Sequence, residues 1–190
     1  MYALEHDPTG TFGRIGSIYD MLRDAEQMTA RISVNAWGLN GNYGQYTADA
    51  RSVDTFVHDK KDLTPVFSVG DRGSFGASQV SSPATGKNVI AVGASTTGVP
   101  GTPSAGAVVN FSSLGPSLDG RIKPDVVAPG VGLCSGLAEE AQSPAGASCL
   151  TGNHAGGNAY YMTLSGTSQA TAIASGVAGL TREFIREQVG

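Results

Sequence analysis

Two short apolar runs constrain the fold of this chain more than any other feature of its sequence. Residues 64–69 (TPVFSV) and 88–94 (NVIAVGA) are almost continuously apolar and lack the alternation of a strand with one solvated face. Runs of this kind are typical of strands in a parallel sheet, which is covered on both faces. The chain is therefore expected to place helices on both sides of a sheet.

Helical patterns flank these runs. In residues 16–29, apolar side chains recur at every third or fourth position, which is the period of a helix with one buried side. Alternating helices and buried strands predict an α/β fold, with a mostly parallel sheet between layers of helices, in a single domain over residues 1–190. Helices are expected at residues 16–29, 47–62 and 168–187, the last of them central, and strands at residues 31–36, 64–69, 88–94 and 160–164. Loops are expected at residues 70–87 and 134–158, with short β pieces among turns at residues 111–129.

Composition and charge exclude several classes of function. The net charge is −4 and the 12 Lys and Arg residues form no basic cluster, so a nucleic-acid partner is not expected. The apolar runs are far shorter than the ~20 residues that cross a bilayer. The first ten residues carry Glu5, His6 and Asp7 and are not expected to form a signal peptide.

Two cysteines leave two interpretations open. Cys134 and Cys149 lie fifteen positions apart in a stretch of small residues, without metal-binding spacing. They are either free thiols or a disulfide that closes a surface loop in an oxidising compartment. Closing a loop of this length contributes about 3 kcal/mol in the chain-entropy model.

The segment from 164 to 180 (LSGTSQATAIASGVAGL) places Ser168 at the start of the longest helix. A hydroxyl there lies beside free backbone N–H groups and the positive end of the helix dipole. Both stabilise the negative charge that develops in acyl transfer. The alternative is that Ser168 is only the N-cap of the helix.

This segment resembles the nucleophile motif of the subtilases, GTSMATPxVAG. Gly166, Thr167 and Ser168 match its start, with Gln169 in place of the usual Met. Three more segments match in the same order along the chain. They are residues 35–38 (NAWG, similar to NSWG), 68–73 (SVGDRG, similar to AAGNEG) and 110–130 (NFSSLGPSLDGRIKPDVVAPG, similar to FSSRGP…KPDVxAPG).

The resemblance implies a secreted, subtilisin-like serine endopeptidase that acts on protein or peptide substrates and needs no cofactor. Ser168 would be the nucleophile, and Asp71 and the Ser168 N–H would face the oxyanion. Extended substrate would be held by Ala36, Trp37 and Gly38, together with Gly70 and Thr167. The resemblance makes a calcium site possible. No cluster of acidic residues has the spacing of calcium ligands, so no metal ligand is assigned.

The chain departs from the family pattern at its catalytic base. The DTG-like and HGTH-like segments that carry the family's Asp and His do not occur, and His6, His58 and His154 are expected to be solvated. A serine without its base is a weak nucleophile. We therefore expect a partial domain that lacks its N-terminal segment, is inactive alone and exposes an apolar edge. A non-catalytic peptide-binding module and an enzyme completed by a partner chain are the alternatives.

A second departure concerns the oxyanion position. Asp71 stands where the family pattern has Asn. An amide donates a hydrogen bond at any pH, whereas a carboxyl group donates only while it is protonated. The complete enzyme is therefore expected to be slow or to work best in acid.

Overall fold

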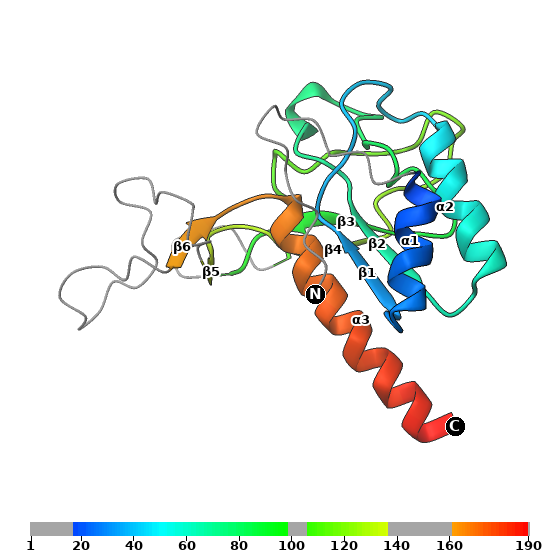
Figure 1. The fold of residues 1–190 in the computed structure, drawn as a ribbon. Helices are drawn as coiled ribbons and strands as arrows, with labels where there is room; N and C mark the ends of the chain where they lie inside the picture. Colours follow the sequence, from blue (N-terminus) through cyan, green and yellow to red (C-terminus); the bar gives the residue numbers. More distant parts are fainter. Residues whose placement is uncertain (1–16, 99–105, 137–160, 190) are drawn as a thin grey trace, which may run out of the picture.

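The computed structural model describes residues 17–98, 106–136 and 161–189. Its centre is a four-stranded sheet in the order β1-β2-β3-β4, in which every neighbouring pair is parallel. The helices α1 and α2 lie on one side of this sheet and α3 lies on the other (Figure 1). The strands are β1 (Ile32–Asn35), β2 (Thr64–Ser68), β3 (Ile90–Ser95) and β4 (Val126–Pro129), and the helices are α1 (Ile18–Gln27), α2 (Ala48–Asp59) and α3 (Thr167–Val189). The predicted α/β class and the parallel sheet between helices are confirmed.

The first helices begin where their capping residues predict. Ser17 accepts a hydrogen bond from the Asp20 N–H, while the Asp20 carboxylate accepts one from the Ser17 N–H, which forms a capping box. The Thr47 hydroxyl accepts from the Ala50 N–H at the start of α2. These bonds satisfy backbone donors that the helices themselves cannot.

The sheet carries a separate core on each face. Phe67 and Ala91 pack with Leu22 of α1 and Phe56 of α2, all fully buried. Val66 of β2 and Val92 of β3 point to the other face and pack with Ala170 of α3. Successive residues of a strand point to opposite faces, so a strand with both faces covered is apolar throughout. This is the reason for the uninterrupted apolar run at residues 64–69.

The two faces differ in how far they are covered. On the α3 side, only the first turns of the helix are buried, at Thr167, Ala170, Thr171 and Ser175. Val177 and Phe184 are 58% and 63% exposed. In Figure 1 the C-terminal turns of α3 extend beyond the sheet. The prediction that this helix is central is therefore wrong for the described residues, because nothing among them covers its outer side.

A small second sheet corrects the loop predicted from residue 134. Strands β5 (Leu133–Gly136) and β6 (Tyr161–Leu164) pair antiparallel and do not join the main sheet. The loop predicted from residue 134 therefore begins with a strand, and the rest of it, with Cys149, lies outside the described residues. Cys134 is disulfide-bonded, which decides against the free thiols. Among the described residues, no helix is long and apolar enough to span a bilayer.

The loops around the sheet are mostly as predicted. One short 3-10 turn, η1 (Gly73–Phe75), interrupts the loop at residues 70–87. Of the short β pieces predicted at residues 111–129, the structure forms only β4.

Candidate active site

The predicted site residues meet at the carboxyl edge of the parallel sheet. Ala36 directly follows β1, Asp71 lies three residues beyond the end of β2, and Ser168 is the second residue of α3. Strands that run in parallel bring their carboxyl ends to one edge, which is where open α/β sheets bind ligands. Residues more than 130 positions apart in the sequence therefore become neighbours.

Ser168 points at a backbone carbonyl rather than at its own helix. Its Oγ donates a hydrogen bond of 2.9 Å to the carbonyl oxygen of Ala36, and the residue is partly exposed. Because α3 begins at Thr167, Ser168 lies inside the first turn, so the interpretation of Ser168 as an N-cap is wrong.

Asp71 caps the N-terminus of α3. Its Oδ1 accepts a 2.8 Å hydrogen bond from the backbone N–H of Thr167, one of the donors that the first turn leaves free. A carboxylate at a helix N-terminus is also stabilised by the helix dipole. Asp71 and Ser168 therefore both lie at the first turn of α3, but Asp71 acts here as an acceptor, where an amide at this position could donate.

The predicted substrate strand continues β1 at the surface. Ala36 and Gly38 are exposed, while the ring of Trp37 packs edge-to-face on Phe67 with centroids 5.5 Å apart. The Ser68 hydroxyl donates to the Trp37 carbonyl at 3.3 Å, and Leu39 donates its N–H to the Ser82 carbonyl. These contacts hold the segment against the end of β2 and against residue 82.

Two glycines let this strand and the Asp71 loop approach the same side chain. A Cβ on Gly38 would collide with Oγ of Ser81, and a Cβ on Gly70 would lie 3.1 Å from the same atom. Gly70 also has φ +94°, which L side chains rarely adopt. The segments at Gly38 and Gly70 thus flank Ser81.

The segment at residues 110–113 holds the Asp71 loop, a role that the sequence did not predict. Arg72 donates its N–H to the Ser113 hydroxyl at 3.1 Å, and Gly73 donates to the Phe111 carbonyl at 2.7 Å. The Ser113 N–H in turn donates to the Gly70 carbonyl at 2.9 Å. The match of NFSS to the family motif was the available signal for this role.

The segment at residues 123–130 fixes the start of α3 against the sheet. The Asp125 carboxylate accepts from the Ala91 N–H and from Lys123 Nζ, both at 2.7 Å, which ties β4 to β3. The Gly130 carbonyl accepts from the Gly166 N–H at 2.9 Å. A Cβ on Gly130 would lie 2.8 Å from the Gly166 carbonyl oxygen, so this close approach requires glycine.

The described residues place no histidine beside Ser168. His58 lies on α2, on the other side of the sheet, with its side chain 82% exposed, as predicted. His6 and His154 lie outside the described residues. The part of the chain that the structure describes also contains no group of three or more His, Cys, Asp or Glu side chains that could hold a metal ion.

A parallel α/β sheet with a serine in the first turn of a helix at its carboxyl edge is consistent with a subtilisin-like fold. The model of the subtilase family matches residues 7–187, and the chain belongs to this family of serine proteases. It is 36% identical over 101 residues to the serine protease AprX of Bacillus subtilis, a match that covers 53% of this chain and 22% of that protein. It is 39% identical over 104 residues to an uncharacterised protein of Aquifex aeolicus, covering 53% and 44% respectively.

Solved structures agree on the fold. The prenylagaramide maturation protease PagA superposes with a TM-score of 0.63 at 21% identity, covering 90% of this chain and 50% of that one. The subtilase cytotoxin SubAB gives a TM-score of 0.51 at 22% identity, covering 90% and 52%. The chain thus spans about half of these solved chains, and less than half of the curated relatives above.

Proposed function

We propose that this chain carries the nucleophile and the substrate strand of a secreted serine endopeptidase, and that its general base is supplied by a segment outside this chain, called the completing segment below. The observation that carries the proposal is the position of Ser168, whose hydroxyl lies 2.9 Å from the Ala36 carbonyl in the first turn of α3. Membership of the subtilase family and the disulfide at Cys134 support it. A disulfide persists in the oxidising compartments that secreted proteins reach.

The reaction follows from the groups at the site. Ser168 Oγ attacks the peptide carbonyl while a histidine from the completing segment takes its proton. The negative charge then forms on the carbonyl oxygen, near the N–H groups of the first turn of α3. Collapse of this intermediate expels the amine, which takes the proton, and leaves an acyl group on Ser168. Water, deprotonated by the same base, then hydrolyses the acyl-enzyme.

Substrate would add a strand beside residues 36–38. The backbone groups of an exposed edge bind extended peptide through main-chain hydrogen bonds. The Ala36 carbonyl is one such acceptor. The Ser168 hydroxyl must therefore give up its hydrogen bond to this carbonyl and turn to the base. Ala36 stands where the family motif has Ser, but pairing with substrate uses only backbone groups and does not depend on this side chain.

Asp71 is expected to slow this reaction at neutral pH. Its carboxylate lies at the N-terminus of α3, where the oxyanion would form, and like charges repel. Replacing it by Asn supplies a donor, and one such donor is typically worth about 10²–10³ in rate. In the complete enzyme, with its base present, Asp71→Asn should therefore raise kcat at pH 7 and have little effect in acid. Equal rates at neutral pH would show that Asp71 does not face the oxyanion.

A non-catalytic peptide-binding module is the second candidate. It is favoured by the hydrogen bond of Ser168 to Ala36 and by the carboxylate of Asp71, since neither activates a nucleophile. Such a module would bind peptide beside residues 36–38 without cleaving it.

Chemical rescue distinguishes the two candidates. The purified chain is treated with a fluorophosphonate probe, with and without imidazole as an external base, and Ser168→Ala serves as the control. The proposal predicts labelling of Ser168 only when imidazole is present. Labelling without imidazole would place a base within this chain. No labelling under either condition would favour the binding module.

A further inference from the structure

A guanidinium group lies over two aromatic rings beside the candidate active site. The carbon Cζ of Arg72 is 4.4 Å from the centroid of the Tyr43 ring and 4.0 Å from that of the Phe75 ring. Both distances are within the range of a cation–π interaction. A planar guanidinium stacks well on aromatic faces, so the two rings together restrict its movement. The charge of Arg72 is therefore held in place near the surface, where Phe75 is 66% exposed.

This charge has no carboxylate partner in the part of the chain that the structure describes. Nε of Arg72 donates to Oε1 of Gln79 at 3.5 Å, which is a long hydrogen bond, and no Asp or Glu of the described residues forms an ion pair with it. Its two terminal nitrogen atoms have no partner there either and are not buried, so they reach solvent. A guanidinium with free N–H donors can bind a carboxylate through two parallel hydrogen bonds. Arg72 is therefore suited to an acidic side chain that comes from outside the chain.

Both segments of the candidate active site contribute to this cluster. Arg72 directly follows Asp71, whose carboxylate accepts from the Thr167 N–H at the first turn of α3. Tyr43 lies in the loop that follows residues 36–38, the predicted substrate strand. The loop after β1 and the loop after β2 thus meet at the Arg72 guanidinium. In an extended peptide beside residues 36–38, every second side chain points to the same side, so one set of side chains can face Arg72.

We propose that Arg72 determines specificity at this site, and that it selects peptides with an acidic side chain close to the bond that Ser168 attacks. The position of the peptide beside residues 36–38 is that of the proposed function, on which this proposal rests. An Asp or Glu side chain of the peptide pairs with the guanidinium, while a Lys or Arg side chain is repelled by it. The chain as a whole has a net charge of −4, which disfavours acidic peptides. A preference for acidic peptides therefore has to come from a local cation.

The test is a binding experiment on the whole chain with three synthetic peptides. Each has about ten residues, in which threonine alternates with glutamate, glutamine or lysine, because threonine favours the extended conformation. A neutral dye at the N-terminus and an amidated C-terminus ensure that only side chains are charged. Anisotropy should show that the glutamate peptide binds about fivefold more tightly than the glutamine peptide, and that the lysine peptide binds more weakly than either. Added salt should reduce these differences.

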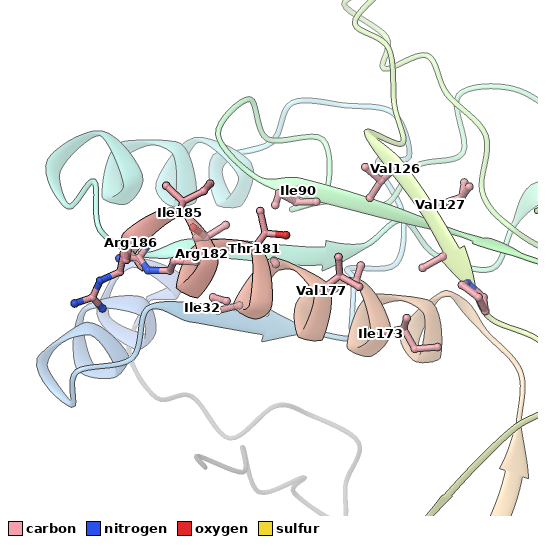
Figure 2. A pocket seen from close by; sticks show the side chains of 15 residues that line it. Ile32, Ile90, Val126, Val127, Ile173, Val177, Thr181, Arg182, Ile185 and Arg186 are labelled. Atoms are coloured by element: carbon pink, nitrogen blue, oxygen red, sulfur yellow. The ribbon is translucent and has the colours of Figure 1, made fainter. Parts of the chain in front are cut away.

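Two substitutions test the role of Arg72 itself. Arg72→Glu should reverse the preference, so that the lysine peptide binds more tightly than the glutamate peptide. Phe75→Leu removes one of the two rings at an exposed position and should lower the preference without reversing it. The control is Arg186→Glu, which makes the same change of charge. Figure 2 shows Arg186 towards the C-terminal end of α3, about 27 Å along the helix from Ser168, so this variant should keep the wild-type preference.

The contrary results separate the role of Arg72 from the endopeptidase activity. Circular dichroism of each variant confirms that it is folded. Equal binding of the three peptides, no binding of any of them, or a glutamate preference that Arg72→Glu does not change would overturn the role of Arg72. Imidazole-dependent labelling of Ser168 by the fluorophosphonate probe would still support the endopeptidase in each of these cases. Conversely, a glutamate preference that Arg72→Glu reverses, in a chain whose Ser168 is never labelled, would support the specificity and count against the endopeptidase.

Discussion

The two faces of the sheet are built from the same strands but differ in how deeply their side chains are buried. On the face of α1 and α2, Phe56, Phe67 and Leu22 are fully buried in one cluster. On the α3 face, Val126, Val177 and Phe184 stay between 45% and 63% exposed. The difference teaches that an apolar pattern in a sequence records what a segment is suited to contact. Whether the contact forms depends on which other segments are present.

Truncating one phenylalanine on each face should give the largest contrast. Phe56→Ala removes a ring from a closed core and should lower the free energy of unfolding by about 3–5 kcal/mol. Phe184→Ala removes a ring that is mostly in water and should change it by less than about 0.5 kcal/mol. Urea denaturation of both variants measures the difference. Similar losses would mean that α3 is covered in solution.

Two aspartates give the next contrast. The buried carboxylate of Asp54 accepts hydrogen bonds from Lys87 and Asn88 N–H groups and from the Tyr46 hydroxyl, at 2.7–2.9 Å. Asp54→Ala leaves buried donors unpaired and should cost about 2–4 kcal/mol. Asp62, by contrast, is 61% exposed and pairs with Arg31 and Arg182.

Because exposed ion pairs contribute little, Asp62→Ala should cost about 1 kcal/mol or less. The same denaturation experiment compares the two aspartates. A larger loss for Asp62→Ala would show that the link between β1 and α3 is a main support of the fold.

Replacing Gly176 should stabilise the isolated chain. In Gly176→Ala the new methyl group meets no atom, and alanine favours the helix, so the free energy of unfolding should rise by about 1 kcal/mol. Gly130→Ala is the control: its Cβ would lie 2.6 Å from that of Ala94, so it should destabilise. A loss of stability in Gly176→Ala would mean that the outer side of α3 is occupied.

The closed face should also show a dependence on alkaline pH. Burial and the hydrogen bond to Asp54 raise the pKa of Tyr46 from 10.0 to about 12. A group whose pKa is raised in the folded state contributes stability below its unfolded pKa. This contribution is therefore present below pH 10 and lost as pH rises towards 12. Melting temperatures across this range should fall less steeply for Tyr46→Phe than for the wild type, and parallel curves would refute this role of Tyr46.

The sequence predicted most of the fold, and it named residues that the structure places together at the carboxyl edge of the sheet. The uninterrupted run at residues 64–69 identified a strand buried on both sides, and GTSQAT identified the helix that begins at Thr167. The role of Asp71 as the cap of α3 was not predictable, because it depends on two segments 96 positions apart meeting at 2.8 Å. The antiparallel pairing of β5 with β6 was missed because Leu133–Gly136 lies in a stretch of small residues without strand periodicity.

The exposure of α3 could not be predicted from the sequence either. Its apolar residues predict a helix in a central position, but no pattern within the chain shows which segments surround it. For the same reason the sequence could place Ser168 without showing that its hydroxyl bonds to Ala36.

Amide hydrogen exchange of the purified chain tests most directly the claim that one face of the sheet is closed and the other is open. Amides of α2 and β2 should exchange slowly, because they open only when the core that contains Phe56 and Phe67 opens. Amides of α3 beyond Gly176 should exchange much faster, although they are helical, because few buried contacts hold them. Equal protection of α3 and α2 would contradict the account and show that the outer side of α3 is covered.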